Sequence, residues 1–241
     1  MKRADFVQAQ RLEAWAAGRA LADSLLGQYC EKYKQRTLPP PAKVIDELLT
    51  EFLGCELARA PLGVHVFAQT EWIGDVTIVT VNSETSRIQG VKDVQGVENV
   101  AKWHEAIHVI NDQPSSKPGQ GMLAGFEAAD RIVCRRGEQA DHSSQVAARE
   151  FFAEEAGRAA AVSPQHLRWA VSFHRLIQGG GRLSNASSWH YLYEAAADLG
   201  VNISALVTQL ELEGLIVVET VAGKRLLHVQ PTLASFLEAN G

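Results

Sequence analysis

The sequence has little of what marks a secreted, disulfide-stabilised or membrane protein. Its three cysteines are an odd number at wide spacings with no Cys-x-x-Cys pair, which argues against a disulfide framework and indicates a reducing compartment. No apolar run approaches the ~18 residues that a bilayer requires. The N-terminus, MKRADFVQAQ, lacks the continuous apolar segment of a secretory signal. We therefore expect a cytoplasmic protein with no membrane partner.

An excess of positive charge is missing as well. The 241 residues carry a formal net charge of −5 at pH 7, so the field of the whole protein repels phosphate backbones. The chain also contains no internal repeat and no low-complexity tract. What it does have is the 46% apolar content of a soluble globular protein and enough length for one substantial core with a small appended module.

Hydrophobic periodicity predicts helices over much of the chain. Apolar residues recur at intervals near 3.6 over residues 4–33, and a second helix is expected between the "TLPPPAK" break and Gly54. The run "SSQVAAREFFAEEAGRAAAV" predicts another long helix, with Ser143 or Ser144 as its N-cap. Three further helices are expected over residues 165–177, 187–199 and 203–213.

Strand signals occur in two places. "GVHVFAQ" and "DVTIVTVNS" are β-like runs joined by "WIGD", where Gly74 permits a hairpin turn. Near the C-terminus, "LIVVETVAGKRLLHVQP" predicts a second hairpin around Ala222 and Gly223. Because this hairpin follows three helices, the last part of the chain is expected to be a winged-helix-like module.

The stretch "AKWHEAIHVIND" places His104, Glu105 and His108 on one predicted helix. Residues four apart lie on the same helix face, so both imidazoles can bind one metal ion. Glu105 is rotated by about 100° from His104 and can reach a water on that ion as a general base. The competing interpretation is a surface helix with two solvated histidines. A separate apolar stripe that would anchor the helix in a core favours the metal site: Val100, Trp103, Ile107 and Ile110.

A catalytic metal site of this kind needs a third protein ligand and an open fourth position. The residues alone leave several candidates downstream of the motif. Zinc is the expected ion for such a ligand set, and manganese also occupies sites made of two histidines and one carboxylate. The candidate third ligands are Asp112, Asp141, His142, Glu150, Glu154 and Glu155.

Two motifs resemble those of the ImmA/IrrE family of metallopeptidases. "HEAIH" matches the family's HE-x-G-H, and "EFFAEEAGRAAAVSP" (150–164) matches its second helical motif with one inserted residue. The resemblance covers about residues 42–164. It implies an α+β, zincin-like metallopeptidase core of the gluzincin type, made of a small sheet and the HExxH helix. His104, His108 and Glu150 would be its ligands and Glu105 its base, with Glu154 and His142 as alternative ligands or outer partners.

The resemblance also implies a biological role. The expected activity is a limited, specific cut in a protein substrate, typically a helix-turn-helix transcriptional repressor in phage, mobile-element or stress-response regulation. In such enzymes a strand beside the site aligns the substrate by strand addition. "DVTIVTVNS" is the candidate for that edge strand, and an interior strand without substrate contact is the competing interpretation. The implied organisation is an N-terminal helical extension (1–38), a metallopeptidase domain (39–164) and the winged-helix-like module (165–241).

Two alternatives remain. The first is a catalytically dormant regulatory or partner-binding protein on the same fold. It is suggested by two departures from the family pattern, which has Gly where this chain has Ile107 and Phe where it has Ala156. A DNA-binding regulator is the second. The third helix of the module, "ISALVTQLELEG", has no Arg or Lys and carries Glu211 and Glu213, whereas a recognition helix supplies cations to phosphates and base edges. Direct nucleic-acid binding is therefore not expected.

Overall fold

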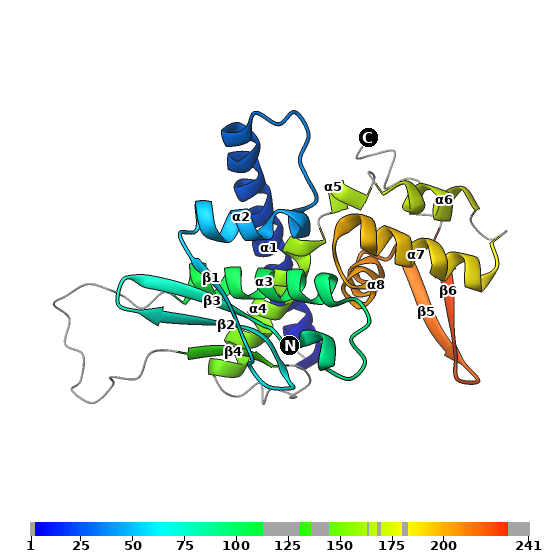
Figure 1. The fold of residues 1–241 in the computed structure, drawn as a ribbon. Helices are drawn as coiled ribbons and strands as arrows, with labels where there is room; N and C mark the ends of the chain where they lie inside the picture. Colours follow the sequence, from blue (N-terminus) through cyan, green and yellow to red (C-terminus); the bar gives the residue numbers. More distant parts are fainter. Residues whose placement is uncertain are drawn as a thin grey trace.

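The computed structural model describes residues 3–112, 131–135, 145–162, 164–167, 170–179 and 183–230 (Figure 1). The fold is mixed α+β, as expected, with helices and two small sheets. The elements are α1 (Arg3–Tyr33), η1 (Pro41–Lys43), α2 (Ile45–Glu47), η2 (Leu48–Phe52), β1 (Glu56–Ala60), β2 (Val66–Ile73), β3 (Val76–Asn82), η3 (Thr85–Arg87), α3 (Val94–Asn111), β4 (Arg131–Arg135), α4 (Gln145–Ala161), α5 (Pro164–Leu167), α6 (Val171–Gly179), α7 (Asn185–Leu199), α8 (Ile203–Leu212), β5 (Ile216–Val221) and β6 (Lys224–Val229).

The larger sheet has the strand order β1-β3-β2-β4. The predicted hairpin is confirmed, since Ile73 of β2 pairs with Val76 of β3 and Gly74 between them has φ +61°. The expectation that "DVTIVTVNS" forms the edge is wrong, because β3 pairs in parallel with β1 and antiparallel with β2. Within the described residues the two edges are β1 and β4.

Strand β1 was not predicted from the sequence. It is short, and its "ELARA" sequence has no β-branched residue, so its pattern resembles that of a polar connection. Contacts with other elements hold the strand in place. Its residues pair with β3, and the Arg59 guanidinium donates two hydrogen bonds to the Glu98 carboxylate on α3, at 3.1 and 2.6 Å.

Helices α3, α4 and α1 pack in that order on one face of the larger sheet (Figure 1). α3 contacts β2 and β3, α4 packs against α3, and α1 packs against the other side of α4. The buried core extends from α1 through η2 and α3 to α7 and α8, and the indole of Trp103 is completely enclosed in it. The helix carrying the HExxH sequence is therefore the central element of the fold.

α3 and α4 approach so closely that one position requires glycine. A Cβ atom placed on Gly157 of α4 would lie 2.7 Å from the His104 backbone N and 2.8 Å from its Cα. Real Cβ atoms do not come so near to backbone atoms, so a side chain here would push the two helices apart. Gly157 therefore fixes the distance between α4 and the histidine-bearing turn of α3.

We expect Gly157→Ala to lower the free energy of unfolding by about 1–3 kcal/mol, the usual cost of overpacking. The matched control is Gly27→Ala, at an exposed position inside α1 where a Cβ meets nothing within 4 Å. Since alanine is the better helix former, this control is expected to gain about 0.5–1 kcal/mol. Urea unfolding followed by circular dichroism measures both, and equal effects of the two substitutions would contradict the close helix contact.

The C-terminal segment forms helices followed by a hairpin. α7 begins at the Ser184 cap and ends at Gly200, which has φ +74°, and the β5–β6 hairpin turns at Ala222 and Gly223 as predicted. The single helix expected over 165–177 is wrong in its bounds. Pro164–Leu167 and Val171–Gly179 are separate helices, and Ala170 before the second is buried without being helical.

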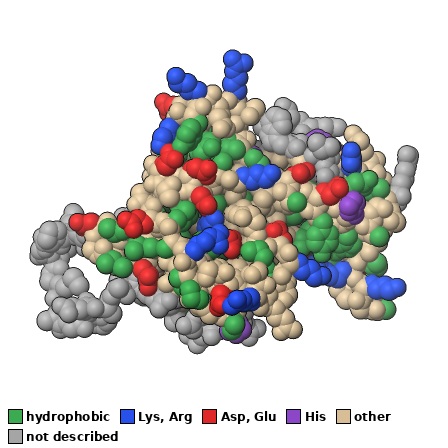
Figure 2. All heavy atoms as spheres, in the orientation of Figure 1, with side chains coloured by type: hydrophobic (Ala, Val, Ile, Leu, Met, Phe, Trp, Pro, Cys, Tyr) green, Lys and Arg blue, Asp and Glu red, His purple; other side chains and the backbone are tan. Residues whose placement is uncertain are grey.

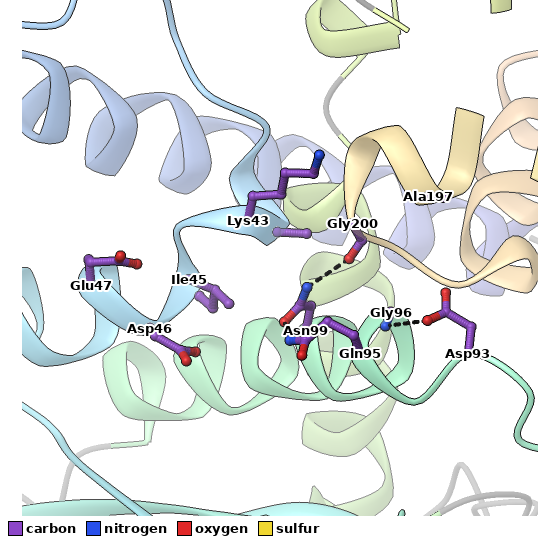
Figure 3. A pocket seen from close by; sticks show the side chains of 11 residues that line it. Lys43, Ile45, Asp46, Glu47, Asp93, Gln95, Gly96, Asn99, Ala197 and Gly200 are labelled. Atoms are coloured by element: carbon purple, nitrogen blue, oxygen red, sulfur yellow. Dashed lines mark hydrogen bonds between the residues drawn. The ribbon is translucent and has the colours of Figure 1, made fainter. Parts of the chain in front are cut away.

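This segment meets α3 at its N-terminal turns. The Asn99 side chain donates a hydrogen bond of 2.8 Å to the Gly200 carbonyl (Figure 3). Around this contact lies a pocket of about 480 Å³, lined among others by Lys43, Asp46 and Gln95. The pocket is not lined by His104, Glu105 or His108. It lies at the other end of α3.

Asp141, His142 and both N-cap candidates, Ser143 and Ser144, lie outside the described residues. Cys30 and Cys55 are free thiols. Among the helices that the structure describes, none has the combination of length and hydropathy that crossing a bilayer requires.

Candidate metal centre

α3 holds His104 and His108 on one face, one turn apart. The Asp93 side chain caps the helix by accepting a hydrogen bond from the Gly96 backbone N at 2.8 Å. The two imidazole Nε2 atoms lie 2.9 Å apart, and both side chains are buried. The spacing seen in the sequence therefore brings two potential ligand atoms to one point.

Glu150 comes to the same point from α4. Its Oε2 lies 3.4 Å from His104 Nε2, and its Oε1 lies 3.5 Å from His108 Nε2. The ligand atoms of His104, His108 and Glu150 all lie within 4.8 Å of one another, the only such group of three among the described residues. A tetrahedral zinc with bonds of about 2.0–2.1 Å separates its ligand atoms by about 3.3 Å. The donor set suits a zinc ion, and the nearest atom pairs, at 2.9, 3.4 and 3.5 Å, lie close to this separation.

Asp112 orients one of the two imidazoles. Its Oδ2 lies 2.7 Å from Nδ1 of His108, across the C-terminal end of α3. A carboxylate accepts but cannot donate, so Nδ1 carries a hydrogen, and Nε2 is the nitrogen that faces Glu150 and His104. Carboxylate–histidine pairs of this kind fix the tautomer and the ring orientation of metal ligands.

Glu105 lies beside this group, fully buried. Thr70 of β2 donates a hydrogen bond of 2.7 Å from its hydroxyl to Glu105 Oε2. The other oxygen, Oε1, is buried and accepts no hydrogen bond from any of the described residues. Burial raises the pKa of this carboxyl, although His104, His108 and Thr70 act in the opposite direction. A buried carboxylate with one unused oxygen has the environment of a general base.

The charges of the group are strongly coupled. Burial alone would raise the pKa of Glu150, but hydrogen bonds and charge from His104 and His108 outweigh it and lower the pKa to about 2. Burial opposes the charged form of His108, yet Glu150, Glu105 and Asp112 together raise its pKa. Cationic and anionic groups thus stabilise one another where a metal ion would supply the positive charge.

The structure separates the candidate third ligands. Glu154 is not part of the group, and its side chain is 63% exposed with its Oε1 2.6 Å from Arg158. Glu155 is buried on the α1 side of α4, where it accepts a hydrogen bond of 3.0 Å from the Trp15 indole. The alternative of Glu154 as a ligand or an outer partner stays a prediction, and the group of ligand atoms in the described residues does not include it. His142 lies outside the described residues.

Two contributors were not recognised from the sequence in their roles. Asp112 was a candidate ligand only, although its position four residues after His108 signals a partner for that ring. Nothing in the sequence around Thr70 indicated that it contacts Glu105. It lies 35 positions before Glu105 in the chain, and only the packing of α3 on β2 brings the two together.

Comparison of the chain with family models, with curated proteins and with solved structures gives no match. No family is therefore shown for this chain. What stands is the arrangement itself, namely two buried histidines and one partly exposed glutamate that could hold a metal ion.

Proposed function

We propose that this protein is a metal-dependent endopeptidase of the ImmA/IrrE type, with Zn²⁺ as its ion and Mn²⁺ as the alternative. The observation that carries the proposal is the convergence of His104, His108 and Glu150 beside a buried glutamate with one free oxygen. Three protein ligands leave a fourth position for water or substrate, which distinguishes a catalytic from a structural zinc site.

The chemistry divides between the ion and the chain. When bound, the ion supplies a Lewis acid that polarises the scissile carbonyl and acidifies the attacking water. Glu105 Oε1 accepts the proton of that water and passes it to the leaving amine. His104, His108 and Glu150 hold the ion, while Asp112 keeps His108 in the ligating tautomer.

The surrounding elements support a zincin-like core. α3 packs on a small sheet, and β4 forms the edge next to β2, the strand that contacts Glu105 through Thr70. A substrate segment adding to an edge beside the site is the recognition mode of this enzyme class. The substrate we propose is a protein cut at a specific place, a helix-turn-helix repressor.

The C-terminal segment is proposed as a winged-helix-like module that contacts protein rather than nucleic acid. Its helix α8 is packed inward, with Leu206, Gln209 and Leu210 fully buried. Its acidic residues also have partners within the chain, since Glu211 accepts from the Val218 backbone and Glu213 pairs with Arg19. Figure 2 shows basic and acidic side chains interspersed over the visible face, unlike the continuous basic patch of a DNA-binding surface.

The test compares the wild-type protein with Glu105→Gln. We expect both to bind one zinc ion, because the substitution leaves every proposed ligand in place. Only the wild type is expected to cleave a repressor in a co-incubation screen of helix-turn-helix proteins, with fragments identified by mass spectrometry. Loss of the general base is expected to slow cleavage by about 100-fold or more.

The outcomes separate the proposal from its alternative. Zinc bound in both proteins with no difference in cleavage or biological effect points to a dormant regulatory protein on this fold. Absence of zinc from the wild type after incubation with the ion contradicts the metallopeptidase altogether.

A further inference from the structure

The hydrogen bond between Thr70 and Glu105 joins two residues that are both completely buried. Its donor and acceptor lie 2.7 Å apart, and each residue has 0% of its surface exposed. The carboxylate therefore has one oxygen held by protein and one without a donor among the described residues. An unused acceptor in a buried place is costly unless a ligand or a bound water completes it.

The position of the Thr70 hydroxyl is fixed by the sheet. Thr70 pairs with Val79 of β3 on one side and with Ile132 of β4 on the other, so its backbone is held from both directions. Threonine is also branched at Cβ, which restricts the rotation that places its hydroxyl. The donor is a rigid point in the molecule, whereas the Glu105 side chain has three rotatable bonds.

We infer that Thr70 is a positioning residue that assigns different roles to the two oxygens of Glu105. It holds Oε2, so that Oε1 is the atom presented to the reacting water. This inference rests on the proposed function, and it adds a residue of β2 to a site otherwise built from α3 and α4. The general base is thereby tied to the strand that borders the edge strand β4.

Three variants test it. Thr70→Val keeps the shape of the side chain and removes the donor, and Thr70→Ser keeps the donor. Thr80→Val is the matched control. Thr80 is buried in the neighbouring strand, opposite Gln69, and so lies on the other face of the sheet from Thr70. It makes the same chemical change without touching Glu105.

Two measurements apply to each protein. Crystal structures without metal give the position of the Glu105 carboxylate, which is expected to rotate away only in Thr70→Val. Calorimetry on zinc-loaded protein gives the affinity for acetohydroxamate, which chelates the ion through two oxygens and hands its proton to the neighbouring carboxylate. We expect Thr70→Val to bind zinc normally and to lose about 10- to 100-fold in acetohydroxamate affinity, the range typical of lost outer partners. Thr70→Ser and Thr80→Val are expected to remain near the wild type.

The results separate this inference from the proposed function. A wild type that holds no zinc ends the proposed function, and the inference falls with it. If the wild type holds zinc and binds acetohydroxamate, but Thr70→Val keeps either the carboxylate position or the full affinity, the inference alone is overturned. If Thr70→Ser is as impaired as Thr70→Val, the effect belongs to packing and the positioning role is also rejected.

Discussion

Replacing Glu150 by glutamine is expected to reduce zinc affinity by more than about 100-fold, beyond the range that loss of an outer partner causes. The amide is neutral and a poor ligand for zinc, so the substitution removes one of three proposed bonds. It also removes the negative charge that faces both imidazoles at 3.4 and 3.5 Å. Cleavage is expected to fall in proportion, because the ion would no longer be held at working concentrations.

Glu154→Gln is the matched control for this prediction. It lies one turn further along the same helix, and its exposed carboxylate pairs with Arg158. Surface ion pairs of this kind contribute about 0–1 kcal/mol, so zinc affinity and fold are expected to change little. Competition titration against a chelating dye measures both variants. A larger loss of affinity at Glu154 than at Glu150 would exchange their roles and contradict the geometry described above.

The HExxH pair was predictable from the sequence because its geometry is local. Residues i and i+4 of a helix share a face whatever the helix packs against, and α3 forms where the apolar stripe indicated. The choice of Glu150 over Glu154 rested on a resemblance. The spacing of the two glutamates on α4 did not decide which of them is the ligand. Only the packing of α4 against α3 at Gly157 decides which of them faces His104.

The order of the strands was not predictable in the same way. Val76 to Asn82 has the β-branched composition of a strand, and that composition suits an edge as well as an interior place. What made β3 interior is β1, a strand with no sequence signal of its own, which is held by pairing and by the Arg59–Glu98 ion pair. Long-range partners decide such cases, and a single sequence does not name them.

Helix α1 packs against α4, the helix that carries Glu150. It packs along the side of α4 opposite α3, and its Gly18 lies against the Ala156 backbone. Its large buried side chains are Trp15, Leu25, Leu26 and Tyr29. At about 1.5–3 kcal/mol for each large apolar side chain, they represent as much free energy as the whole stability of a typical domain, about 5–15 kcal/mol.

Removal of residues 1–38 is therefore expected to leave a chain that neither unfolds cooperatively nor binds zinc. Single substitutions of two leucines in α1, one buried and one exposed, test the same prediction in smaller steps. Leu26→Ala, at a site with 0% exposure, is expected to cost about 2–5 kcal/mol. Leu12→Ala, at a site with 52% exposure, is expected to stay within about 0.5 kcal/mol.

Zinc connects this prediction to the site. An ion that binds only the folded state stabilises it, by about 2.7 kcal/mol at 100 times its dissociation constant. Added zinc is expected to raise the urea midpoint of Leu26→Ala and of the wild type by similar amounts, because Leu26 lies in the hydrophobic core and is not one of the proposed ligands. A Leu26→Ala protein that folds cooperatively but gains nothing from zinc would mean that α1 acts on the site directly. If the chain without residues 1–38 still unfolds cooperatively and still binds zinc, α1 is a separate extension and the rest of the chain folds and binds the ion without it.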